Sequence, residues 1–93
     1  METFAVERYL PGSDQPHLVA IAEQLATSDL PAGVHYRGSI IVVGDEACIC
    51  LFDAESADHV RAANAALGLP VARVVPAAVV QPALHAGPDT GVT

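Results

Sequence analysis

IIVVGDEACICLFDA, residues 40–54, consists of two apolar, β-branched runs separated by Gly44-Asp45. A Gly-Asp pair is typical of a tight two-residue hairpin turn, because both turn residues need positive φ angles. The stretch therefore predicts two antiparallel strands that form the centre of a small sheet. The turn also predicts which residues face each other across the two strands: Ile40 and Ile49, Gly38 and Leu51, and Tyr36 and Asp53.

Side chains alternate along the second of these strands, which runs from Glu46 to Ala54, so its two faces can be distinguished. One face carries Cys48, Cys50 and Phe52, and the other carries Ile49, Leu51 and Asp53. Both faces are apolar enough to be covered, so we expect helices on the cysteine face and a partner on the other.

The two cysteines lie on one face of one strand, where the geometry disfavours a mutual disulfide. We therefore expect Cys48 and Cys50 to be reduced thiols packed beneath the helices. The alternative is that they are soft metal ligands, which is the less common role for small residues in a core.

The rest of the chain supplies two more strands and two helices. Residues 3–10 alternate as a strand, and the cap residues Ser13-Asp14 then begin a helix that ends near Ser28. Residues 34–43 form the first strand of the hairpin. A second helix begins after Ser56 and ends at Gly68-Leu69-Pro70, which is a strong helix stop.

The last strand is predicted over residues 73–80. Pro76 cannot donate a hydrogen bond to a ladder, so this strand belongs at an edge of the sheet. Residues 81–93, with two prolines and two glycines, are predicted to be a flexible tail.

The order β-α-β-β-α-β predicts a single α+β domain, residues 1–80, with a ferredoxin-like sandwich fold. In this fold a four-stranded antiparallel sheet carries both helices on one face. Right-handed crossovers place the first and third strands at the centre and the others at the edges. The opposite face is too apolar to remain exposed to solvent, since it carries Ala5, Ile40, Ile49 and Leu51. We therefore expect a homodimer in which two sheets pack face to face.

The net charge of the chain indicates which classes of partner it can bind. The chain has 93 residues, a net charge of −7 and no lysine. Without a basic stripe it is unsuited to nucleic acid or an anionic membrane surface, whereas cations are favoured. The N-terminus shows neither a basic segment nor a long apolar segment, and no apolar run approaches the roughly 20 residues that a membrane helix requires. We expect a cytoplasmic protein.

Two carboxylates on the central strands form the best candidate site. Glu7 and Asp53 are both expected on the uncovered face near Tyr36, and His35 is the only histidine close to them. Packed together, the carboxylates would raise each other's proton affinity or hold a cation between them. The alternative is purely structural, with Glu7 paired to Arg8 or Arg37 and Asp53 leading into the turn before the second helix.

Four segments of the sequence resemble a family of small ferredoxin-like proteins of unknown function, some of which are described as nickel-binding. The segments are VERYLPG (6–12), Tyr36-x-x-Ser39, DEACICLFDA (45–54) and VRAANAALGLPVARV (60–74). The resemblance implies a dimeric ferredoxin-like domain and favours Glu7, Tyr36, Ser39, Cys50 and Asp53 as functional positions. Many relatives carry a histidine immediately before the serine that corresponds to Ser39. Gly38 takes that place here, and His35 is the histidine that could replace it.

The leading hypothesis is a small homodimeric binding protein that holds a divalent transition metal, nickel by resemblance, through Glu7, His35 and Asp53, with Tyr36 and Ser39 beside the site. Such ligands suit nickel without selecting it over zinc or copper. No nucleophile motif or phosphate-binding loop is present. The rival hypothesis is a small dimeric α+β barrel enzyme, in which an apolar organic molecule enters a cleft under the sheet and Glu7 or Asp53 acts as general base.

Overall fold

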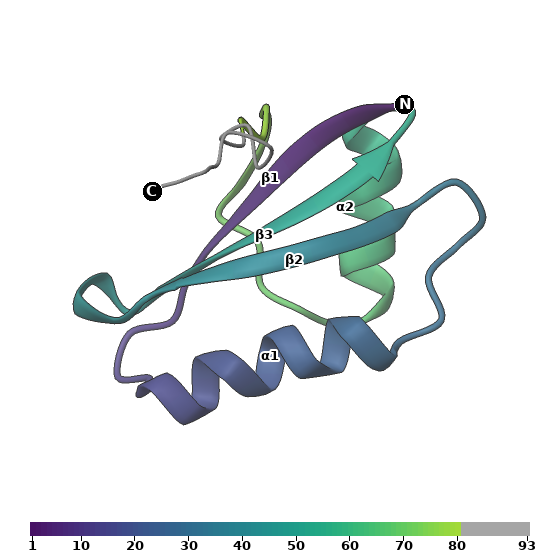
Figure 1. Ribbon diagram of the computed structural model, residues 1–93. Helices are drawn as coiled ribbons and strands as arrows, with labels where there is room; N and C mark the ends of the chain where they lie inside the picture. The colour runs from purple at the N-terminus through teal and green to yellow at the C-terminus, as the bar shows by residue number, and fades with distance from the viewer. Residues whose placement is uncertain (81–93) are drawn as a thin grey trace, which may run out of the picture.

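The computed structural model describes residues 1–80 and has the predicted order of elements (Figure 1). The helices are α1 (Gln15–Thr27) and α2 (Ala57–Ala66), and the strands are β1 (Glu2–Tyr9), β2 (His35–Val42), β3 (Ala47–Ala54) and β4 (Arg73–Pro76). The predicted tail, residues 81–93, lies outside the described residues.

The helices begin and end where the local chemistry predicts. The Asp14 carboxylate accepts a hydrogen bond from the His17 amide at 3.0 Å, and the Ser56 hydroxyl accepts one from the His59 amide at 3.3 Å. These caps satisfy amides that have no partner inside the helix. After α2, Gly68 adopts a φ of +70°, and the Leu69 amide donates to the Asn64 carbonyl at 3.2 Å. This left-handed glycine closes the helix.

The sheet is antiparallel, in the order β2-β3-β1-β4, so the predicted central and edge strands are confirmed. The last strand is shorter than expected, because β4 ends at Pro76 rather than at residue 80. The last ladder pair is Phe4 with Pro76, and one further backbone hydrogen bond, from the Ala77 amide to the Thr3 carbonyl, follows it.

The turn between β2 and β3 differs from the predicted one. Val43–Asp45 form a short 3₁₀ turn, and the positive φ, +52°, belongs to Glu46 rather than to Gly44-Asp45. Two hydrogen bonds tie Glu46 to the segment after β1: its carbonyl accepts from the Leu10 amide, and its carboxylate accepts from the Gly12 amide. These bonds hold a conformation that a glutamate rarely adopts.

The predicted register between β2 and β3 is confirmed near the turn, but it is wrong at the far end of the two strands. Ile40 faces Ile49 and Gly38 faces Leu51, as predicted. A bulge between Tyr36 and Gly38 then makes Arg37 an extra residue. As a result Tyr36 faces Phe52 rather than Asp53, and His35 takes the place opposite Asp53.

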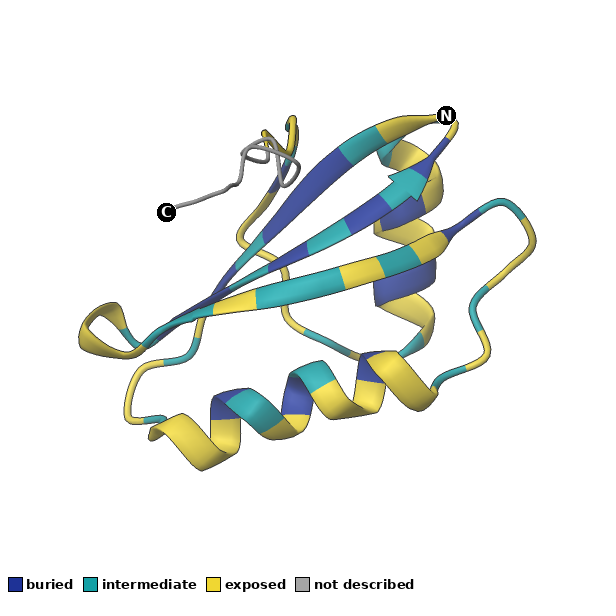
Figure 2. Ribbon diagram, in the orientation of Figure 1, coloured by how far each residue is buried: buried dark blue, intermediate teal, exposed yellow. Residues whose placement is uncertain are grey.

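The core lies between the sheet and the two helices. The helix-facing residues of β1 and β3 are buried, as are the inner sides of both helices (Figure 2). One cluster joins both helices to the same face of the sheet; it includes Val6, Leu18, Leu25, Cys48, Cys50, Phe52, Val60 and Ala63. No helix covers the opposite face, which we call the open face and which carries Ala5, Glu7, Ile40, Ile49, Leu51 and Asp53.

Candidate functional site

The open face is apolar at its centre and charged on both sides of that centre. Ala5 lies opposite Leu51, and Ile40 lies opposite Ile49, so these four side chains form one apolar patch. Ile40 remains 55% exposed in the single chain. The polar residues of this face, Thr3, Glu7, His35, Arg37, Asp53 and Arg73, lie around this patch.

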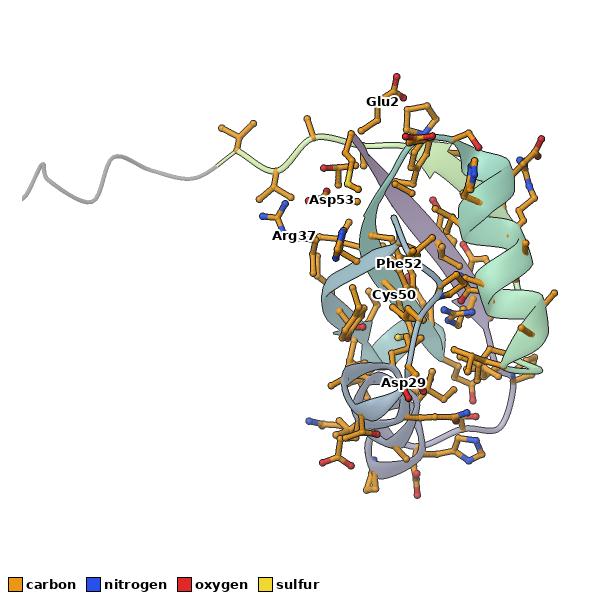
Figure 3. The ribbon with its side chains drawn as sticks, turned by 90° about the vertical axis from the view of Figure 1, so that its right-hand side faces the viewer. Glu2, Asp29, Arg37, Cys50, Phe52 and Asp53 are labelled. Atoms are coloured by element: carbon orange, nitrogen blue, oxygen red, sulfur yellow. The ribbon has the colours of Figure 1, made fainter. Side chains whose placement is uncertain are left out.

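Asp53 lies in a small polar cluster at one end of the open face. Its carboxylate accepts a hydrogen bond from the Thr3 hydroxyl at 2.6 Å and pairs with the Arg37 guanidinium at 2.9 Å. Figure 3 shows Arg37 and Asp53 beside each other on the sheet. The Thr3 hydroxyl first, and then Arg37, hold the pKa of Asp53 below its ordinary value. His35 faces Asp53 across the ladder and also lowers its pKa.

Glu7 lies in a separate ion pair. Its carboxylate contacts the Arg73 guanidinium of β4 at 2.8 Å, and this hydrogen bond lowers the pKa of Glu7. The structural alternative named the wrong partners, because Arg8 points to the helices and Arg37 pairs with Asp53. Strand β4 supplies the partner because Arg73 stands opposite Glu7 in the ladder.

The two carboxylates do not share a site within one chain. Glu7 stands opposite Ile49, whereas Asp53 stands opposite Thr3, four residues further along β1. At about 3.3 Å per residue this offset is about 13 Å. The pKa of each carboxylate is lowered rather than raised, so the expected mutual repulsion is absent. The structure therefore brings His35 and Asp53 together and leaves Glu7 apart.

Among residues 1–80, no group of three or more histidine, cysteine, aspartate or glutamate side chains is placed to hold a metal ion. One chain thus offers the pair His35 and Asp53 on the open face, and Asp53 is already engaged by Arg37 and Thr3. A complete site of the predicted composition would need ligands from outside the single chain.

Tyr36 and Ser39 lie on the helix side of the sheet, not beside Asp53. The bulge at Arg37 turns Tyr36 toward Phe52, and the two ring centroids are 5.5 Å apart. The Tyr36 hydroxyl is 2.5 Å from the Ser39 hydroxyl, which donates to the Cys50 sulfur at 3.1 Å. Burial raises the pKa of Tyr36. Tyr36 and Ser39 therefore contact the thiols rather than the carboxylates.

Cys48 and Cys50 are fully buried beneath the helices, as predicted, and both are free thiols. Figure 3 shows Cys50 and Phe52 between the sheet and the helices. The two sulfurs are 3.4 Å apart. Burial first, and then the neighbouring Cys50, raise the pKa of Cys48 to about 12. The Cys48 thiol is therefore protonated at neutral pH.

Arg8 is the residue that sequence reasoning missed. It stands opposite Cys48 on the helix side of the sheet and has no exposed surface. Its guanidinium donates to the Asn64 side-chain oxygen at 2.5 Å and to the Pro70 carbonyl at 2.9 Å. The sequence does contain a signal for this burial: side chains alternate along β1, and Arg8 falls on the same side of the strand as Phe4 and Val6.

Residues 4–76 match the family described as nickel responsive protein SCO4226-like. The chain belongs to this family. The matched range contains every side chain of the site described above except Thr3, so the resemblance noted in the sequence is confirmed at the level of the family. No curated protein and no solved structure matches the chain.

Two surface hollows formed by residues within 1–80 lie away from the carboxylates of the open face. The first, about 380 Å³, lies between the end of α1 and the start of β2, where Leu30, Val34 and Tyr36 contribute to its wall. The second, about 480 Å³, lies between α2 and β4. Neither is lined by Glu7 or Asp53, so these hollows offer no general base of the kind that the enzyme hypothesis requires. Among the described residues, no helix is long and apolar enough to cross a membrane.

Proposed function

We propose that this protein binds a divalent transition metal, nickel in the first place, as a cytoplasmic homodimer closed through the open face. The single observation that carries the metal proposal is that His35 faces Asp53 on an uncovered surface, in a member of a nickel responsive family. Imidazole and carboxylate groups are ligands that nickel accepts, although they do not exclude zinc or copper.

The dimer supplies what one chain lacks. The apolar patch of the open face has no helix over it, and a second copy of the same patch would remove it from water. A two-fold axis parallel to the sheet, crossing the strands near Ala5 and Leu51, reverses the strand direction of the second copy. Position 7 of one β1 then lies over position 3 of the other.

This arrangement brings the three predicted ligands together across the interface. Asp53 is the ladder partner of Thr3, so Glu7 of the second copy would approach Asp53 and His35 of the first. By symmetry a dimer has this combination twice. Nickel would displace Arg73 from Glu7 and Arg37 from Asp53, and this exchange makes the affinity modest.

Calorimetric titration of the untagged full chain with Ni²⁺ tests the proposal. His35→Ala, Asp53→Asn and Glu7→Gln should each weaken nickel binding, whereas the exposed His17→Ala should bind as the parent does. Binding should also weaken below about pH 6, where an ordinary histidine becomes protonated. A parent that binds no nickel, zinc or copper, or a His35→Ala variant that binds as well as the parent, would remove the proposal.

Sedimentation distinguishes a variant that loses only the metal from one that also loses the dimer. If Glu7→Gln loses nickel and remains dimeric, Glu7 is a ligand. If Glu7→Gln also dissociates, its effect on nickel is indirect, and Glu7 would have to be withdrawn from the ligand set.

A further inference from the structure

Arg8 is a buried cation whose charge has no carboxylate beside it in the described part of the chain. Its two hydrogen-bond acceptors, the Asn64 amide oxygen and the Pro70 carbonyl, are both neutral, and its Nε atom has no partner. The ion pairs among residues 1–80 use the other three arginines. A guanidinium remains protonated in a folded protein, so this buried charge calls for an anion.

Two thiols lie on the same side of the sheet as this charge. Arg8 stands opposite Cys48 in the ladder, and its charge acts to lower the pKa of that thiol. Burial outweighs this effect, so the Cys48 thiol of the empty protein stays protonated and does not balance the charge of Arg8. The fold thus holds two adjacent sulfurs on the same side of the sheet as a positive charge that a dithiolate would neutralise. We call Arg8, Cys48 and Cys50 the thiol cluster.

We propose that Cys48 and Cys50 bind one soft monovalent metal ion of the Cu(I) class, and that Arg8 balances the charge of the resulting dithiolate. Two S–H bonds break, two metal–sulfur bonds form and two protons leave, with no change in oxidation state. Two thiolates and one monovalent ion carry a net charge of −1, which the guanidinium offsets. A divalent ion would give a neutral dithiolate and leave Arg8 unbalanced.

The number of available ligands points to the same class of ion. No third histidine, cysteine, aspartate or glutamate joins the two thiols among the described residues. Zinc in structural sites almost always takes four ligands, whereas soft thiolate pairs suit Cu(I). With metal–sulfur bonds of about 2.3 Å, two sulfurs on one ion lie at most about 4.6 Å apart. The two sulfurs are 3.4 Å apart in the empty protein and would separate by about 1.2 Å to hold an ion in a straight S–metal–S arrangement.

A hydrogen-bond chain supports the charged form of Cys50. The Ser39 hydroxyl donates to the Cys50 sulfur, so its only proton is used and the Tyr36 hydroxyl donates to Ser39 in turn. Such outer hydrogen bonds orient and stabilise a metal-bound thiolate. The chain ends at Tyr36, which is partly exposed.

This site is separate from the one proposed for nickel. The thiol cluster lies on the helix side of the sheet, and His35 and Asp53 lie on the open face. The failure of one proposal therefore leaves the other standing, because each has its own ligands and its own probe.

The ligands are tested by titrating the reduced, untagged full chain with Cu(I) under anaerobic conditions, against a coloured Cu(I) chelator. We expect one Cu(I) per chain, an ultraviolet band from the thiolate–metal bonds, and release of two protons per ion. Cys48→Ser and Cys50→Ser, checked for folding by circular dichroism, should each lose the band and the competition, whereas His35→Ala should keep both. An excess of Zn²⁺ or Ni²⁺ should not displace Cu(I).

The charge balance is tested at Asn64. Asn64→Asp places a fixed carboxylate beside Arg8, so the cluster no longer needs an anion, and Cu(I) affinity should fall by about tenfold or more relative to Asn64→Ala. Asn64→Ala is the uncharged control: both variants lose the amide hydrogen bond to the Val60 carbonyl, and Asn64→Ala also removes the neutral acceptor of Arg8 without adding charge. A parent that takes no Cu(I) from the chelator, serine variants that bind like the parent, or equal affinities for the two Asn64 variants would each overturn the proposal.

Discussion

Glu7 and Asp53 share the open face of the sheet but belong to different ion pairs, since Glu7 is bound by Arg73 and Asp53 by Arg37 and Thr3. Each carboxylate is stabilised in its charged form. The open face is therefore a set of satisfied charges around an apolar patch, and this arrangement determines how the protein should respond to pH and to substitution.

The free energy of unfolding should fall as the pH is lowered through the ordinary range of carboxyl groups. The pKa values of Glu7 and Asp53 are lowered in the folded chain, so the unfolded chain binds protons first as the pH falls. Their contribution is present above the unfolded value, about 4, and is lost below it. Thermal unfolding between pH 3 and pH 7 should show a shallower slope for Asp53→Asn than for the parent. Equal slopes would mean that these pairs do not stabilise the fold.

Leu51→Asp should dissociate the proposed dimer. Leu51 lies beside Ala5 in the apolar patch, and an unpaired charge buried in an interface costs several kcal/mol or forces the partners apart. Sedimentation at micromolar concentration measures the effect. Val43→Asp is the matched control, since Val43 is 50% exposed in the β2–β3 turn. A parent that sediments as a monomer would refute the dimer itself.

Neither thiol should react with an aromatic disulfide reagent while the protein is folded and metal-free. Both sulfurs have no exposed surface, and the pKa of Cys48 is raised to about 12, so the reactive thiolate is scarce. Both thiols should react at once in guanidinium. Fast modification without denaturant would show that the helices do not cover this face of the sheet.

Asn64→Ala should lower the free energy of unfolding by about 1–3 kcal/mol, because it leaves a buried Arg8 nitrogen without its acceptor. The matched control on the same helix is Arg61→Ala, whose exposed pair with Asp58 should matter by no more than about 0.5 kcal/mol. Urea unfolding of the three proteins decides the comparison. Similar values for Asn64→Ala and Arg61→Ala would mean that water or another group replaces the lost acceptor.

The sequence was sufficient to predict the order of elements, the order of strands and the burial of the cysteines. Those features follow from periodicity, caps and the handedness of crossovers, which are local or general. Side chains of β3 alternate without interruption, so Cys48 and Cys50 were assigned to the correct face.

The site was predicted less well, because it depends on one irregular residue. A single extra residue, Arg37, exchanges the faces of Tyr36 and His35, and no local pattern in the sequence marks the bulge. The partner of Glu7 was missed for a related reason: Arg73 is 66 positions away in the chain and meets Glu7 only through the pairing of β1 with β4. Arg8 was overlooked because an arginine in a strand usually implies a solvated edge.

Both outer strands also limit how the protein can associate. In β4 the Ala77 amide points to Thr3, so the neighbouring Pro76 nitrogen points outward and has no hydrogen to offer another strand. In β2 the bulge at Arg37 breaks the regular spacing that an added strand would need. Growth of the sheet sideways, the route to open-ended fibrils, is therefore obstructed at both borders. The proposed dimer avoids both borders, because a two-fold pairing of the flat open faces would close on itself at two copies.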